Sequence, residues 1–227
     1  MAIKMTFLSL LLVVAPALAA DTAPASARLA AVSGDVTIQS KSGGRLGKTG
    51  ALLAEGDEVS TAAKSTAVIE LPDGSRLKLR ELGRLAVTLP TEKSPITDIS
   101  LTLGSVFAKV RKQLAGRSFR VRTETAVAAV RGTEFFTAYG RTVGDKRDLW
   151  VCVNEGAVDV ATTKSKKALG VPAGKGVLIK SGLDLTKPQA FDWTKTLNWN
   201  MDADKGDIED KTSLDAAYSD LLDQDYR

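Results

Sequence analysis

The strongest constraint on the fold of this chain is an alternation of apolar and polar residues with a period of two. It is repeated in many short segments along most of the sequence. The clearest cases are residues 67–71, 77–79, 85–89, 99–103, 106–110, 119–121 and 149–153. A period of two turns alternate side chains to one face of an extended chain. Each segment therefore predicts a short β-strand with one apolar face and one solvent-exposed face.

Turn signals separate these segments, and helical spacing sustained over three turns is missing between residues 29 and 180. A glycine followed closely by an apolar strand opener recurs at Gly34, Gly56, Gly74, Gly104, Gly156 and Gly174. The unequal intervals differ from a strict solenoid, whose repeats keep one length. Each unit has a single apolar face, so the units must stack on one another. We predict an all-β fold: an irregular β-solenoid or β-roll-like stack of short strands and hairpins, with a short helical C-terminal extension.

Composition narrows the chemistry. The chain has no His and a single Cys, Cys152. Histidine is the side chain most used for acid–base catalysis near neutral pH and the commonest transition-metal ligand. A single thiol excludes an internal disulfide framework. We therefore expect no enzyme activity, no cofactor and no metal, and we interpret Cys152 as a small packing residue in a strand.

The N-terminus has the three-part layout of a secretory signal peptide. Lys4 precedes an apolar run, and small residues stand at Ala17 and Ala19. The run is shorter than the roughly 20 residues that cross a bilayer, although a retained anchor is the alternative. We predict a signal peptide at residues 1–19, a linker at 20–28, a β domain at 29–182 and a C-terminal helical, acidic extension at 183–227. A cleaved leader predicts a periplasmic protein without a membrane span.

Several blocks, in order, resemble the FecR domain family. They are Gly34 to Val36, LLAEGDEVST (52–61), STAVIELPDGSRLKL (65–79), LTLGSVFAKV (101–110), FRVRT (119–123), AAVRGTEFF (128–136) and VNEGAVDV (153–160). The resemblance spans roughly residues 29–180. It implies a periplasmic all-β domain, similar to those that relay a signal from an outer-membrane iron transporter. Signalling members carry a sigma-factor-handling segment and one membrane helix before this domain, whereas this chain begins with the leader. The resemblance implies that the chain binds a partner protein in the envelope.

The most specific block supplies one candidate site: Arg131, Gly132, Thr133, Glu134 and Phe135. The glycine allows a positive φ or a close approach between two strands. Buried charges usually need partners, so Arg131 and Glu134 fit a structural corner that ties neighbouring strands together. The alternative is a small polar recognition site for a partner.

A second candidate is an aromatic and basic surface formed by Trp193, Trp199, Arg120 and Arg122. Aromatic rings stack on sugars, so these residues would suit cell-wall glycan or another polyanion. Other basic residues, including Arg76, Lys78 and Arg80, are predicted on solvent-exposed strand faces, where they discourage edge aggregation. Nucleic acid is not expected, because no aromatics alternate with the basic residues.

The C-terminal region changes character. Residues 188–199 favour a clamp in which Trp193 and Trp199 cap an open end of the β stack. Residues 201–212 are acidic and expected to be mobile. Ser213 predicts the cap of a last helix with Leu214, Ala217, Tyr218, Leu221 and Leu222 on one face, which packs on the body or on a partner. The overall prediction is a non-catalytic periplasmic module for protein binding, signalling or scaffolding, and the alternative is a glycan- or polyanion-binding protein.

Overall fold

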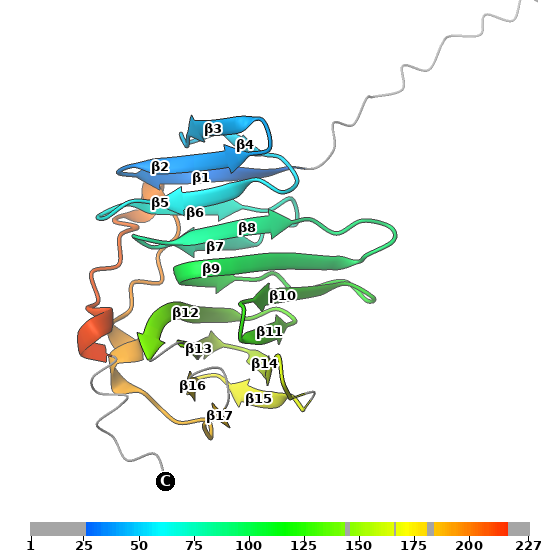
Figure 1. The fold of residues 1–227 in the computed structure, drawn as a ribbon, viewed down its shortest axis with the longest axis vertical. Helices are drawn as coiled ribbons and strands as arrows, with labels where there is room; N and C mark the ends of the chain where they lie inside the picture. Colours follow the sequence, from blue (N-terminus) through cyan, green and yellow to red (C-terminus); the bar gives the residue numbers. More distant parts are fainter. Residues whose placement is uncertain (1–25, 144–145, 166, 181–183, 218–227) are drawn as a thin grey trace, which may run out of the picture.

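The structure is a computed structural model that describes residues 26–143, 146–165, 167–180 and 184–217. Within these residues the chain forms strands from near its start to Leu185, and helical turns occur only after that point. The predicted all-β stack is therefore confirmed. Figure 1 shows the strands stacked side by side in successive levels, from β3 at one end to β17 at the other. The predicted signal peptide and most of the predicted linker lie outside the described residues.

The strands follow one another with short connections. The first nine are β1 (Ala27–Ser33), β2 (Val36–Ser40), β3 (Gly43–Leu46), β4 (Leu52–Leu53), β5 (Glu58–Thr61), β6 (Thr66–Glu70), β7 (Arg76–Leu79), β8 (Arg84–Thr88) and β9 (Ile96–Lys109). The others are β10 (Ser118–Arg122), β11 (Ala126–Val130), β12 (Glu134–Val143), β13 (Lys146–Glu155), β14 (Ala157–Thr162), β15 (Leu169–Pro172), β16 (Gly176–Lys180) and β17 (Asp184–Leu185). β1 begins at Ala27, just before the predicted domain start at residue 29.

The strands form two facing sheets that share β9. One, which we call the covered sheet, has the order β4-β1-β6-β7-β9-β12-β13-β16-β17. The other, the open sheet, has the order β3-β2-β5-β8-β9-β10-β11-β14-β15. Neighbouring strands are antiparallel except β9 and β10, which are parallel. The chain passes back and forth between the sheets, so each level of the stack contributes strands to both.

β9 crosses from the open sheet to the covered sheet at Gly104. Its first half pairs with β8 and β10, and its second half pairs with β7 and β12. Gly104 has a φ of 87°, and a Cβ there would lie 2.5 Å from the Cα of Gly83. A side chain is excluded on both grounds. The prediction of two strands separated by a turn at Gly104 was wrong, because the chain continues as one strand and changes sheet instead.

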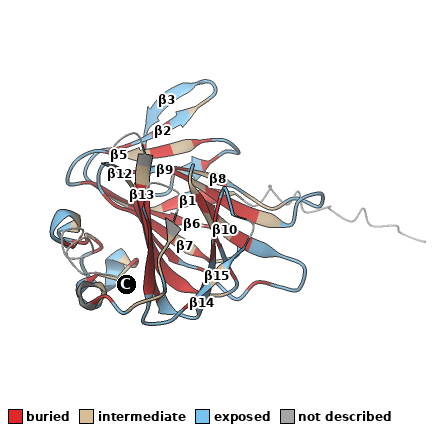
Figure 2. Cartoon of the chain, turned by 60° about the horizontal axis from the view of Figure 1, so that its bottom comes forward, coloured by how far each residue is buried: buried red, intermediate tan, exposed pale blue. Residues whose placement is uncertain are grey.

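The main core lies between the two sheets. It contains the inward-facing residues of almost every strand, including Leu29, Ile38, Leu85, Phe119 and Phe135, each fully buried. Figure 2 shows these buried segments running through the middle of the stack. The period-two pattern predicted this face of each strand.

A second apolar cluster lies on the outer face of the covered sheet. Sheet register places one residue from each of seven strands, β1 to β16 in sheet order, in a line across this face: Ala31, Val68, Lys78, Phe107, Phe136, Cys152 and Gly176. The segment at residues 191–217, which we call the C-terminal strap, packs over it through Phe191, Leu197, Met201, Ile208 and Ala217. Figure 1 shows the strap running up one side of the stack and returning. The sequence-based idea that Trp199 caps an open end was wrong, because the strap covers a face.

The strap contains little regular structure. Two 3₁₀ turns, η1 (Asp192–Thr196) and η2 (Ala203–Lys205), are followed by a helix that starts at residue 214. The Ser213 hydroxyl accepts a hydrogen bond from the Ala216 amide at 3.2 Å, which confirms the predicted cap. Met201, Ile208 and Asp210 are buried, so the expectation of a mobile acidic tail at 201–212 was wrong. None of the helical segments in the described residues has the length and hydropathy needed to cross a bilayer.

Candidate functional site

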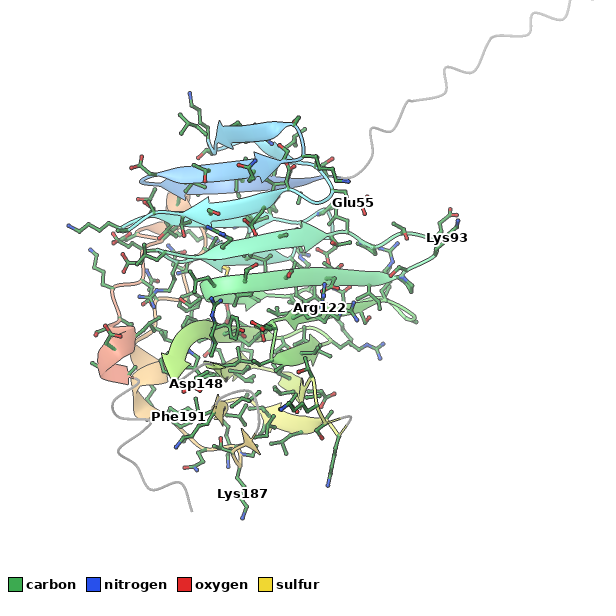
Figure 3. All side chains as sticks on the ribbon, in the orientation of Figure 1. Glu55, Lys93, Arg122, Asp148, Lys187 and Phe191 are labelled. Carbon is green, nitrogen blue, oxygen red and sulfur yellow. The ribbon has the colours of Figure 1, made fainter. Side chains whose placement is uncertain are left out.

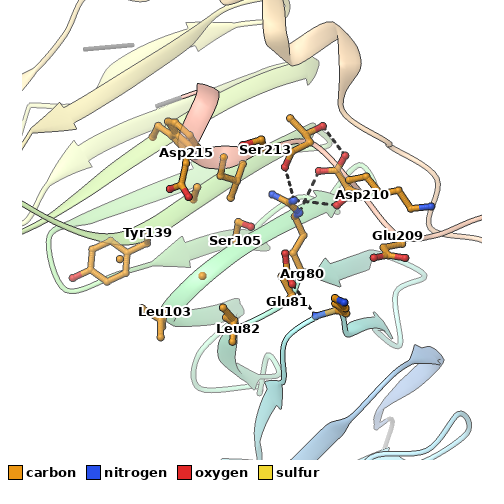
Figure 4. Close-up of a pocket in the computed structure, with 18 of the residues that line it drawn as sticks. Arg80, Glu81, Leu82, Leu103, Ser105, Tyr139, Glu209, Asp210, Ser213 and Asp215 are labelled. Atoms are coloured by element: carbon orange, nitrogen blue, oxygen red, sulfur yellow. Dashed lines mark hydrogen bonds and ion pairs between the residues drawn. The ribbon is translucent and has the colours of Figure 1, made fainter. Parts of the chain in front are cut away.

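A pocket of about 690 Å³ opens where β9 changes sheet. The turn after β7, the crossover in β9, strands β12 and β13, and strap residues 209–215 form its walls (Figure 4). We call it the crossover pocket. Its size falls within the range typical of ligand sites.

The apolar wall of the crossover pocket is exposed to solvent. Leu82 is 61% exposed and Leu103 is 38% exposed. Leu82 also has a φ of 53°, in the left-handed region that a bulky residue rarely adopts. Strain of this kind persists where the surroundings fix the backbone, and it is often found at binding sites. The fold therefore presents a leucine in an unusual and exposed position.

The charged wall centres on a buried ion pair. Arg80 Nε lies 3.2 Å from Asp210 Oδ2, and their side chains are 6% and 1% exposed. Arg80 Nη2 also donates to the carbonyls of Asp210 at 3.0 Å and Thr212 at 2.8 Å. Burial lowers the pKa of the Arg80 guanidinium, and the charge of Asp210 opposes that shift. Arg80 therefore joins the β sheet to the strap at the edge of the pocket.

Lys78 makes a second buried connection beside it. The side chain has no exposed surface, and Nζ donates to the carbonyls of Asn198 and, at 2.8 Å, Asn200. Nζ also lies 4.4 Å from the centre of the Phe107 ring. Burial lowers the pKa of Lys78 from 10.5 to about 8. This ammonium group is held by peptide carbonyls and an aromatic ring instead of water.

The sequence-based prediction that Lys78 and Arg80 lie on a solvent-exposed face was therefore wrong. Both point outward from their strand, but the strap covers that face. A signal for this was present in the sequence. Strands of the covered sheet also carry apolar residues at positions whose side chains point away from the main core. Examples are Val68, Phe107 and Trp150, all fully buried. A sheet face with such residues needs a cover.

The predicted corner at residues 131–135 joins three strands. Gly132 has a φ of 79°, and the Thr133 hydroxyl donates to the Ala157 carbonyl at 2.9 Å. Glu134 is 5% exposed; Lys109 Nζ lies 3.2 Å from its carboxylate and Asn154 Nδ2 lies 2.7 Å from it. Arg131 is exposed, while Phe135 belongs to the main core. Four of the five residues thus contribute to packing or cross-strand bonds, and Arg131 alone faces solvent.

The predicted aromatic and basic surface is not assembled. Trp199 is half-buried on the covered sheet. Its ring packs edge-on against the Phe107 ring, with 5.1 Å between the ring centroids. Arg120 and Arg122 lie on the open sheet, where both bind Asp98 at 2.6 and 3.1 Å. Figure 3 labels Arg122 on the open sheet and Phe191 at the strap. The side chain of Trp193 lies outside the described residues. Trp199 and the two arginines therefore occupy opposite outer faces.

Asp98 pairs with two neighbouring arginines on the open sheet, Arg120 and Arg122. Burial alone would raise the pKa of its carboxyl, but hydrogen bonds from Arg120 and Arg122 outweigh burial and hold the pKa below its usual range. The two like charges are thus tied to one acid. These arginines remain partly exposed, at 38% and 48%.

The described residues contain no group of three or more His, Cys, Asp or Glu side chains placed to hold a metal ion. Cys152 is buried, and burial raises the pKa of its thiol. A thiol in this environment is protonated and inert, as expected for a packing residue.

Comparisons with known proteins agree with this architecture. The family model described as "FecR protein" matches residues 57–159, from the start of β5 through β14. Two crystal structures of a "putative anti-sigma factor" from Parabacteroides distasonis, at 2.50 and 1.65 Å resolution, are similar in fold. Each has a TM-score of 0.52 and 18% sequence identity, with 72% of both chains covered. No curated protein matches the chain.

The matched region includes most of the crossover pocket and both buried cations, Lys78 and Arg80. The strap lies after it. The resemblance inferred from the ordered sequence blocks is thus confirmed by the family model, which identifies a FecR domain at residues 57–159.

Proposed function

We propose that this chain is a non-catalytic, periplasmic protein-binding module that acts in signalling or as a scaffold in the cell envelope. The FecR domain supports a signalling or regulatory role in general terms. The leader-like sequence at residues 1–19 supports export. The fold neighbours are named as an anti-sigma factor, which is a class of protein that works by binding another protein.

The crossover pocket is the observation that carries the proposal. Most of its lining residues are in the matched domain, it exposes Leu82 and Leu103, and charged groups surround these leucines. An apolar centre with a polar rim is the usual anatomy of a protein-binding site. The glycan alternative has less support, because Trp199 and the two arginines lie on opposite faces.

The test is site-specific photocrosslinking in the native host. A photoreactive residue at Leu82 should crosslink one envelope protein, whereas the same residue at Thr37, exposed on the open sheet, should not. A Leu103→Asp change should suppress the Leu82 adduct. N-terminal sequencing of the periplasmic fraction should begin at Ala20 if the leader is cleaved as predicted. Retention on the cell-wall pellet at high salt, with no protein adduct, would instead support the glycan alternative.

A further inference from the structure

The strap lies on the covered sheet in the way that a bound peptide lies on a receptor. Apart from its short helical turns it is irregular, and it contacts the sheet through a few apolar anchors. Phe191, Leu197, Met201 and Ile208 are 4%, 5%, 6% and 7% exposed. Each comes from a segment that cannot bury an apolar side chain by itself. The sheet therefore supplies most of the contact surface.

The sheet has features that fit a peptide. Lys78 and Arg80 together donate to four main-chain carbonyls of the strap, those of Asn198, Asn200, Asp210 and Thr212. Main-chain carbonyls are present in every peptide, so these contacts favour an extended chain of almost any sequence. Two cations fixed by burial on a flat sheet therefore form a built recognition element for peptide backbone.

Side-chain recesses give the surface its preference. A Cβ at Gly176 would lie 2.6 Å from the Phe191 ring, so the absence of a side chain at that position creates the space that Phe191 occupies. Phe107 forms an edge-on surface for Trp199. Arg80 faces the carboxylate of Asp210. The fitting ligand is thus an extended peptide with aromatic and aliphatic anchors and one acid.

The strap does not satisfy the surface completely. Arg80 Nε and Asp210 Oδ2 face each other as an ion pair, but Arg80 Nη1 is buried without a hydrogen-bond partner in the described part of the chain. Burying an ion pair costs desolvation energy that only full hydrogen bonding repays. The strap therefore leaves one donor of Arg80 that a competing segment can satisfy.

We propose that the outer face of the covered sheet is a peptide-binding surface, and that the strap is its built-in occupant, which an acidic peptide with aromatic and aliphatic anchors from a partner protein displaces. This surface adjoins the crossover pocket, because Arg80 and strap residues 209–215 also line that pocket, but the face beneath the strap is not part of the proposed function, so the inference goes beyond it. The strap blocks the surface until a competing segment of the same chemistry arrives.

Cys152 gives a direct measure of strap opening, because it is the single thiol of the chain and is 2% exposed beneath this cover. Asp210→Asn removes the charge facing Arg80 but keeps an oxygen for its bonds from the Asn198 amide and the Thr212 hydroxyl. Asp204→Asn, at an exposed strap position, is the matched control. Maleimide should modify Cys152 about 10-fold faster in the mature Asp210→Asn protein, and at the original rate in Asp204→Asn.

The binding probe is a fluorescein-labelled synthetic peptide with the sequence of residues 189–215. It should bind the Asp210→Asn protein about 10-fold more tightly than the original protein, because the internal competitor is weakened. A peptide carrying the Asp210→Asn change should bind about 10-fold more weakly than the native peptide, and this comparison needs no change in the protein. Lys78→Met in the Asp210→Asn protein should also weaken binding, with circular dichroism as the check on folding.

Two results would overturn the inference. If Cys152 reacts faster but the native peptide does not bind, the uncovered face does not recognise peptides. If Cys152 reactivity is unchanged and no peptide binds, the strap is a fixed part of the fold. Crosslinking at Leu82 tests a leucine that is exposed with the strap in place, so either failure leaves the proposed function standing.

Discussion

The two outer faces of this stack are made by the same kind of strand, yet they have opposite chemistry. β9 contributes to both: Phe107, outward on its covered half, is fully buried, whereas Ser100, outward on its open half, is half-exposed. The covered face carries aromatic residues and two buried cations. The open face carries small and charged residues such as Thr37, Thr88 and Arg122, all exposed.

A side chain that points outward from its strand is therefore not necessarily exposed to solvent. Arg120 and Arg122 on the open face stay partly exposed and share one acid, Asp98. Arg80 on the covered face is 6% exposed and depends on the strap for its partners. What differs is the presence of a covering segment. If the strap accounts for the different burial of the two faces, a change on the covered face should cost more stability than a matched change on the open face.

Phe107→Ala should destabilise the protein by about 3–5 kcal/mol, the usual cost of removing a buried aromatic ring. The ring contacts Phe136, Trp199 and Lys78, so its loss leaves a cavity beneath the strap. Ser100→Ala, on the same strand, should change stability by about 0.5 kcal/mol or less. Urea unfolding measures both. Equal effects would mean that the covered face is not a second core.

Lys78 should make stability rise with pH. Its folded pKa, about 8, lies below the unfolded value of 10.5, so the unfolded chain binds more protons between these values. The penalty of burying the charge is fully present below pH 8 and is relieved as the pH increases to 10.5. The gain is on the order of 3 kcal/mol at most.

Unfolding midpoints measured from pH 7.5 to 10.5 would detect this rise, and Lys78→Met should flatten it. A slope that persists in Lys78→Met would assign the effect to another group. On the open sheet the sign is reversed. The lowered pKa of Asp98 contributes stability that is present above the unfolded value and is lost as the pH falls through the folded value.

Gly176→Ala should cost about 1–3 kcal/mol, because the added methyl group would overlap the Phe191 ring and the Val151 carbonyl, 2.6 and 2.8 Å away. Gly170→Ala, on the open sheet, places a methyl 3.6 Å from Asp159 Oδ1, an ordinary contact. It should shift stability by about 0.5 kcal/mol or less. Thermal unfolding of the two variants compares them directly, and a tolerated Gly176→Ala would place Phe191 elsewhere.

Arg122→Ala should have the smallest effect, about 0–1 kcal/mol, because the side chain is 48% exposed and Arg120 still binds Asp98. The same urea assay applies, in low and high salt. A decrease in the free energy of unfolding of more than about 2 kcal/mol would show that charged groups on the open face stabilise the fold as much as those on the covered face.

Much of the candidate site was beyond local sequence patterns. Leu103 was assigned to an ordinary strand at residues 99–103, and Leu82 was not singled out. Their joint exposure depends on the sheet change at Gly104. Glu134 was correctly picked as a residue that needs a partner. Its partners Lys109 and Asn154 come from β9 and β13, and no spacing rule identifies them.

Local sequence patterns predicted most of the strands and the inward face of each, because side-chain alternation and turn residues act over a few positions. The ordered sequence blocks predicted the FecR domain that the family model matches at residues 57–159. Which of the two outer sheet faces is exposed to solvent could be seen only in the folded structure. Lys78 meets the carbonyl of Asn198 across 120 residues of chain. Burial of an outward residue depends on whether a distant segment of the chain covers it. The alternation of apolar and polar residues within the strand does not indicate whether such a segment exists.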